Sequence, residues 1–130
     1  MKTYNGGSIS NVIKNINLGE IYVTDCAERA IRYANAQATE EVNPAMDQEL
    51  AENGIILEIE VENEPNWLRR TNGGSLDSCE AVVRQFVITK ATVRFLSNER
   101  TVYGTRWTGY KNSQQVVEFL QTRGIEVKII

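Results

Sequence analysis

The sequence predicts an α+β fold with more strands than helices, in a single domain that covers residues 1–130. The clearest strand is Gly54–Glu62, where apolar and acidic residues alternate from Leu57 onward, as expected when one face is buried and the other solvated. Helical spacing of apolar residues is found mainly in the first half of the chain and in Gln114–Thr122. Several neighbouring strands are too close in sequence for a helical crossover, so we expect antiparallel pairing to dominate.

The first part of the chain predicts two strands that each lead into a helix. A strand over Lys2–Tyr4 and a Gly6-Gly7 turn precede a helix from Ser8 to about Asn15, with Ser8 as a suitable N-cap. The β-branched and aromatic run Ile21–Val23 is typical of a buried strand.

The second helix should begin near Cys26, because Asp25 and Glu28 form a capping-box pattern. Small apolar residues allow a helix to lie close to a sheet, and they dominate one stripe of this segment. The stripe consists of Ala27, Ala30, Ile31, Ala34 and Ala38. Tyr33 lies beside the stripe, where we expect its ring to border a cleft.

The remaining elements follow from shorter patterns of apolar and turn-forming residues. They are a weak helix through Met46 and Leu50 that ends at Asn53-Gly54, a loop over Asn63–Ser75, strands over Glu80–Val83, Gln85–Thr89, Thr92–Leu96 and Thr101–Tyr103, a helix over Gln114–Thr122 capped by Ser113, and a strand over Ile125–Ile130.

The composition restricts the chemistry, because the chain contains no histidine. Serine–histidine hydrolases, cysteine–histidine proteases and histidine-ligated zinc sites are therefore excluded. Cys26 and Cys79 are the only cysteines and do not form a disulfide framework, and we expect no structural metal site.

Charge and hydropathy restrict the classes of partner that we expect for this protein. The net charge of −3 does not favour a broad nucleic-acid-binding surface. No apolar run is long enough to cross a bilayer and no secretory signal is evident, so we expect a cytoplasmic protein with reduced thiols and no membrane partner.

Three segments are candidates for function, and each also has a purely structural interpretation. Glu80 opens an apolar strand directly after a Gly-rich loop, so its carboxylate either points into a cleft or is a charge at a strand edge. The segment Asn5–Ser8 suits close approach by a ligand or simply turns the chain. Arg69-Arg70 with Trp67 either clamp a phosphate and stack on a base or lie on the surface.

Taken in order, three blocks resemble the ADP-ribosyltransferase superfamily, which includes diphtheria-type toxins, poly-ADP-ribose polymerases and many small bacterial and phage proteins. The blocks are Tyr4-Asn5-Gly6-Gly7-Ser8, then Tyr22-Val23-Thr24-Asp25 with Ala30-Ile31-Arg32-Tyr33-Ala34, and finally Ser78-Cys79-Glu80-Ala81-Val82-Val83. The resemblance covers roughly residues 2–95. It implies split antiparallel sheets with NAD, the substrate, in the cleft between them.

The resemblance also implies roles for individual residues. Glu80 would stabilise the positive charge that develops when the nicotinamide–ribose bond breaks, and would fix the ribose hydroxyls. Tyr33 or Tyr22 would stack on nicotinamide. Asn5 would hydrogen-bond the ribose, in a position where histidine or arginine is usual. The other residues expected at the NAD site are Tyr4, Gly6, Gly7, Thr24 and Arg70.

These residues support more than one function. The first is mono-ADP-ribosyl transfer from NAD to a macromolecular acceptor, for which a protein is favoured over a nucleic acid. The second is a non-catalytic nucleotide-binding or inhibitor protein on the same fold, such as a phage-type immune antagonist, and the absence of histidine and the modest size of the chain motivate it. The third is a structural subunit whose cleft is filled.

Overall fold

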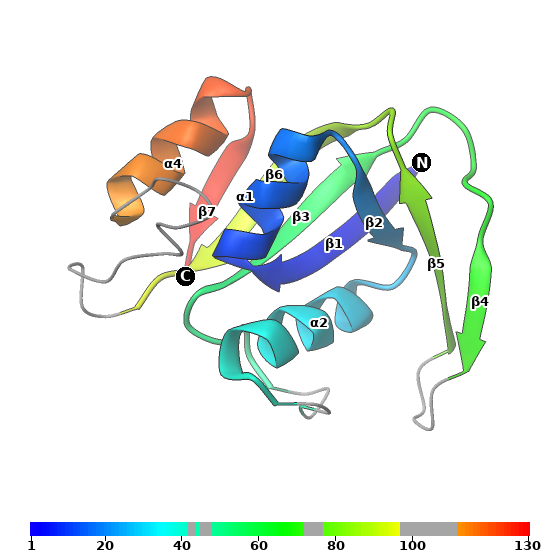
Figure 1. The fold of residues 1–130 in the computed structure, drawn as a ribbon, viewed down its shortest axis with the longest axis horizontal. Helices are drawn as coiled ribbons and strands as arrows, with labels where there is room; N and C mark the ends of the chain where they lie inside the picture. The colour runs from blue at the N-terminus through cyan, green and yellow to red at the C-terminus, as the bar shows by residue number, and fades with distance from the viewer. Residues whose placement is uncertain (42–43, 45–47, 72–76, 97–111) are drawn as a thin grey trace.

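The structure, a computed structural model, describes residues 1–41, 44, 48–71, 77–96 and 112–130, with the backbone alone described at 69–71 and 77. Its elements are β1 (Lys2–Ser8), α1 (Ile9–Leu18), β2 (Ile21–Thr24), α2 (Ala27–Thr39), β3 (Gly54–Glu60), β4 (Leu68–Thr71), β5 (Asp77–Val83), β6 (Val87–Arg94), α4 (Ser113–Thr122) and β7 (Glu126–Ile129) (Figure 1).

The described strands form one seven-stranded sheet in the order β4-β5-β2-β1-β3-β6-β7. Pairing is antiparallel everywhere except between β6 and β7, which are parallel and have α4 between them in the chain. The α+β class and the dominance of antiparallel pairing are thus confirmed.

The junction between β1 and β2 is the weakest in the sheet. Tyr4 and Thr24 are the single residue pair in register there, whereas β1 pairs with β3 along its whole length from Lys2 to Ser8. The two strands diverge beyond that pair (Figure 1). This divergence opens the sheet between its two halves.

Alternating strand residues build the main core together with α1 and α4. In β3, Leu57 and Ile59 are fully buried, while Glu60 is exposed, as the alternation predicts. The apolar face of α1 contributes Val12 and Ile13, and α4 contributes Val116, Phe119 and Leu120. Burial of these side chains is the main source of stability in such a core.

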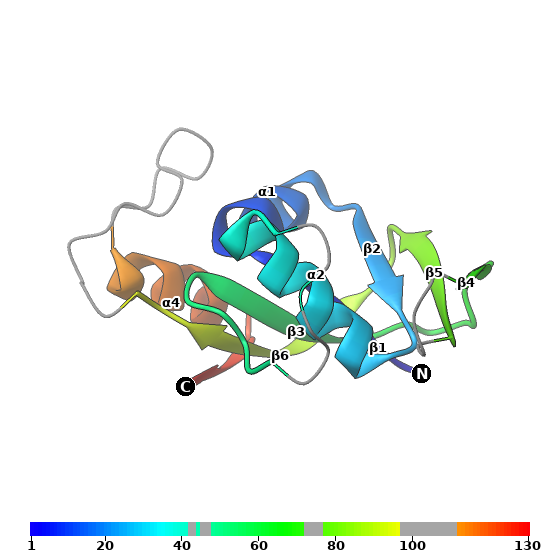
Figure 2. The same ribbon diagram turned by 90° about the horizontal axis from the view of Figure 1, so that it is seen from below.

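Helix α2 packs directly against β1, along which it runs (Figure 2). Ala30 and Ala34 are completely buried, as the alanine stripe predicts. Gly6 of β1 permits this approach, because a Cβ built there would lie 1.8 Å from the carbonyl oxygen of Ala30. Gly6 therefore serves helix–strand packing, and the predicted turn at Gly6-Gly7 is instead the continuation of β1.

The predicted capping box of α2 is wrong. Cys26 occupies the N-cap position without a side-chain cap, and Asp25 Oδ1 accepts a hydrogen bond from the Cys79 backbone N–H at 2.9 Å. The reason is tertiary: β5 lies alongside and offers Asp25 a donor on the neighbouring strand. At α4, Asn112 replaces Ser113 as the cap, whereas Ser8 caps α1 as expected.

Several predicted boundaries also differ from the structure. β4 lies within the expected loop Asn63–Ser75, and the expected strands Gln85–Thr89 and Thr92–Leu96 form the single strand β6. Residues 48–50 are not helical, and the rest of that weak helix lies largely outside the described residues, as does Thr101–Tyr103.

Candidate functional site

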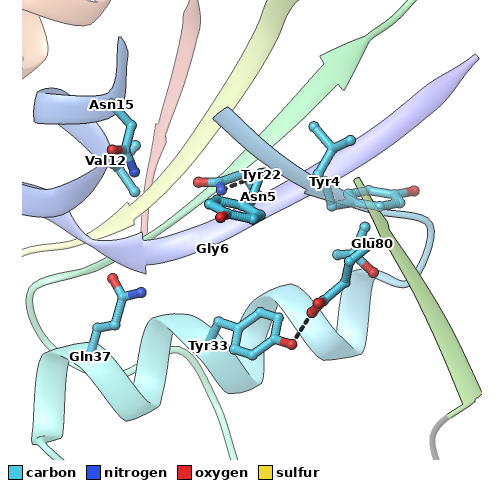
Figure 3. A pocket seen from close by; sticks show the side chains of 11 residues that line it. Tyr4, Asn5, Gly6, Val12, Asn15, Tyr22, Tyr33, Gln37 and Glu80 are labelled. Atoms are coloured by element: carbon cyan, nitrogen blue, oxygen red, sulfur yellow. Dashed lines mark hydrogen bonds between the residues drawn. The ribbon is translucent and has the colours of Figure 1, made fainter. Parts of the chain in front are cut away.

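A cavity of about 290 Å³ lies where β1 and β2 part. Its walls come from β1, β2, β5, α1 and α2, so segments far apart in sequence meet there (Figure 3). The lining residues are Tyr4, Asn5, Gly6, Val12, Asn15, Tyr22, Val23, Thr24, Tyr33, Gln37 and Glu80. Its volume is at the lower end of the range that is common for small-molecule sites.

Glu80 supplies the carboxylate of this cavity from β5. Its side chain is 8% exposed, and the hydroxyl of Tyr33 donates a hydrogen bond to Glu80 Oε1 (Figure 3). Burial raises the pKa of Glu80 above its ordinary value, and the positive charge of Arg29 opposes this rise. The site therefore holds a carboxylate with restricted hydration at the edge of an open cavity.

Asn5 has a fixed orientation on β1. Its Nδ2 donates to the carbonyl oxygen of Tyr22 at 2.7 Å and so bridges β1 and β2 beside their divergence. Its Oδ1 is buried and has no hydrogen-bond partner among the described residues. Because such an atom loses hydration without compensation, it favours a ligand that donates a hydrogen bond.

Three tyrosines surround the cavity in different ways. Tyr22 is 64% exposed and available at the rim, whereas Tyr4 and Tyr33 are half-buried. Tyr33 contacts Glu80 through its hydroxyl, so its role includes holding that carboxylate. The ring of Tyr22 is more exposed than those of Tyr4 and Tyr33, so a ligand can reach it more easily.

The other expected site residues are distributed unevenly. Thr24 lines the cavity and its Oγ1 accepts from the Cys26 backbone N–H at 3.3 Å, whereas Gly7 lies behind Gln37 and is not part of the wall. Arg70 lies on β4 opposite Ser78, but its side chain is outside the described part of the chain. Trp67 packs against the core, and its Nε1 donates to Glu64 at 3.2 Å.

Sequence reasoning missed two polar residues of α2. Arg29 is 4% exposed and its Nε donates to Ser78 Oγ at 3.1 Å. Gln37 Oε1 accepts from the Ser8 backbone N–H and from Asn11 Nδ2, at 2.9 and 3.1 Å. The available signal was helical spacing, since Arg29, Tyr33 and Gln37 recur every four residues and share one face.

Ionisable residues do not cluster into a metal centre within the described ranges, where no group of three or more possible ligands was found. The helices described are all too short or too polar to span a membrane.

No protein-family model, curated protein or solved structure matches this chain.

Proposed function

We propose that this protein has an ADP-ribosyltransferase-like fold, binds NAD in the cavity between β1, β2 and α2, and transfers ADP-ribose to a macromolecular acceptor, favouring a protein. The observation that carries the proposal is the meeting of three polar groups from separate elements at one cavity. These are the Glu80 carboxylate, the Tyr33 hydroxyl bound to it, and the unpartnered Asn5 Oδ1.

Glu80 is the proposed catalytic residue. When the bond between nicotinamide nitrogen and ribose breaks, the electron pair leaves with nicotinamide and positive charge develops on the sugar. A preorganised carboxylate with few competing waters stabilises that charge strongly. The acceptor nucleophile then forms the new bond to the same sugar carbon and loses its proton.

Asn5 and Tyr22 supply the binding contacts in this proposal. Asn5 Oδ1 accepts from a ribose hydroxyl, which gives its buried oxygen the partner that it lacks among the described residues. Tyr22 stacks on the nicotinamide ring from the rim. The cavity volume fits the nicotinamide–ribose half of the dinucleotide better than the whole molecule, so the adenosine half would lie against the outer surface.

A cytoplasmic location completes the proposal. Cys26 and Cys79 are both free, and Cys79 is buried. Reduced thiols are the usual state in that compartment.

Incubation with labelled NAD and a cell extract tests the activity. We expect labelled macromolecule and released nicotinamide from the native chain, and loss of both from Glu80→Gln with folding retained. Glu62→Gln, an exposed glutamate away from the cavity, is the matched control and should keep full activity. Equal transfer by the Glu80 and Glu62 variants would remove Glu80 from the mechanism.

A non-catalytic NAD-binding or inhibitor function is the second candidate, and the engagement of Glu80 by Tyr33 favours it. One carboxylate oxygen is already occupied, and Asn5 carries no charge with which to assist turnover. Reversible NAD binding without release of nicotinamide would support this function over transfer.

A further inference from the structure

A buried cation lies beneath the proposed site. Arg29 is in the first turn of α2 and is 4% exposed, which is rare for an arginine without close polar partners. Its Nε donates to Ser78 Oγ at 3.1 Å, and Ser78 is itself 2% exposed. The guanidinium is therefore held against β5 and away from solvent.

Strand geometry brings this cation toward Glu80. Ser78 and Glu80 are two residues apart on β5 and so point to the same face of the sheet. Arg29 and Tyr33 are four residues apart on α2 and so face the same way. Two side chains of one helix thus meet two side chains of one strand, with Tyr33 hydrogen-bonded to Glu80 and Arg29 to Ser78.

The electrostatic effect of Arg29 agrees with this geometry. Burial disfavours the ionised form of Glu80, and the nearby guanidinium favours it. A carboxylate must be ionised to stabilise positive charge on a sugar. Burial therefore opposes, and Arg29 favours, the ionised form of Glu80 that the proposed reaction needs.

We propose that Arg29 is a positioning residue that, anchored by Ser78, keeps Glu80 ionised and directed into the cavity. The inference rests on the proposed function for its biological meaning. Arg29 does not line the cavity, so it acts through Glu80 and not by contact with substrate.

Other ionisable groups lie around Glu80 and belong in the design of a titration. They are Tyr33 on α2, Tyr22 on β2 and Tyr4 on β1, which line the same cavity, and Asp25, which accepts a hydrogen bond from the backbone N–H of Cys79 next to Glu80. None of these is changed in the variants below, so a difference between variants reports on Arg29.

The test follows the Glu80 carboxyl by NMR in protein labelled at glutamate side chains, with the signal assigned by its absence in Glu80→Gln. In Arg29→Gln the Glu80 titration midpoint should move to higher pH, and in Arg29→Lys it should stay close to that of the native chain. In the transfer assay, Arg29→Gln should lower kcat about tenfold at the acidic end, recover as pH rises, and leave KM unchanged.

A purely structural role predicts a different result. It would lower the unfolding midpoint of both Arg29 variants without moving the Glu80 titration, and that outcome would overturn the inference. If Arg29→Gln does not fold, Ser78→Ala carries the test, because it removes the hydrogen bond that Arg29 Nε donates to Ser78 and should move the midpoint in the same direction.

The two proposals fail separately. An unmoved Glu80 midpoint in a chain that still transfers ADP-ribose rejects the role of Arg29 alone. A moved midpoint in a chain that neither binds nor cleaves NAD rejects the proposed function and leaves the coupling between Arg29 and Glu80.

Discussion

Gly6→Ala tests whether the close packing of α2 on β1 holds the candidate site together. The added Cβ would meet three backbone atoms of Ala30, at 1.8 Å from the oxygen, 2.5 Å from the carbon and 3.0 Å from the Cα. Backbone atoms cannot rotate aside as a flexible side chain does. Helix α2 must therefore move away from β1 by about 1.5 Å to restore an ordinary contact.

The expected cost follows from that displacement. Overpacking a well-filled interior by one methyl group costs about 1–3 kcal/mol, and a collision with backbone belongs at the upper end, so we expect a loss of about 3 kcal/mol. Urea denaturation measures it: with an m-value of about 1.5–2 kcal/mol/M, the midpoint should fall by about 1.5–2 M.

Gly124→Ala is the matched control for this measurement. Gly124 has φ 75°, and nothing lies within 4 Å of a Cβ built there. Its substitution costs only the left-handed backbone conformation, about 1 kcal/mol. Equal losses in the two variants, or a loss below about 1 kcal/mol for Gly6→Ala, would refute the packing argument. Since α2 carries Tyr33, Gly6→Ala should also weaken ligand binding, whereas Gly124→Ala should not.

Three further predictions concern stability. Burial raises the pKa of Glu80 in the folded state, so the stability that this group contributes is present at acidic pH and is lost as pH rises through the folded-state pKa. In urea titrations, Glu80→Gln should therefore unfold no more easily than the native chain at pH 7. Any gain in stability of this variant over the native chain should vanish at pH values below the ordinary carboxyl range. Asp25→Ala should lower the free energy of unfolding by about 1 kcal/mol, because the Cys79 N–H loses its acceptor, whereas Glu28→Ala should lower it by less than about 0.5 kcal/mol. The reverse order in chemical denaturation would support the capping box instead. Gln37→Ala removes two hydrogen bonds that join α2 to the start of α1 and should lower the free energy of unfolding by about 1–2 kcal/mol, whereas an unchanged thermal midpoint would show that those bonds contribute nothing.

Local patterns predicted the elements that are stabilised locally. Ser8 caps α1, the alternation of β3 places Leu57 in the core, and Ala30 lies on the buried stripe of α2. In each of these the decisive interaction is a short-range cap or a periodic face, which a single sequence records.

Patterns failed where a distant segment decides the structure. β4 contains Arg69-Arg70 and no alternation, and it is a strand because it pairs with β5. Asp25 does not cap α2 as expected, because it accepts a hydrogen bond from a backbone N–H of β5. Strand formation depends on such neighbours more than helix formation does.

The candidate site shows the same division. Asn5, Tyr33 and Glu80 were selected by their resemblance to motifs of a family, and the structure brings all three to one cavity. Arg29 escaped notice because a charged residue in the first turn of a helix ordinarily faces solvent. In the structure its Nε donates to Ser78, which lies 49 positions away in the sequence.

Asn5 links the opening of the sheet to the binding of a ligand. Where β1 and β2 part, the strands lose their backbone ladder, and the Asn5 amide replaces one of its bonds by donating to Tyr22. That bond fixes the orientation of the amide, and Oδ1 is buried without a partner among the described residues. An unmet buried acceptor costs about 1–3 kcal/mol, and a donor on a ligand removes this cost. Ligands with a suitably placed hydroxyl should therefore bind more tightly than their deoxy analogues, by about 5-fold to 150-fold in Kd, and calorimetry can make this comparison on the native chain without altering Asn5 itself.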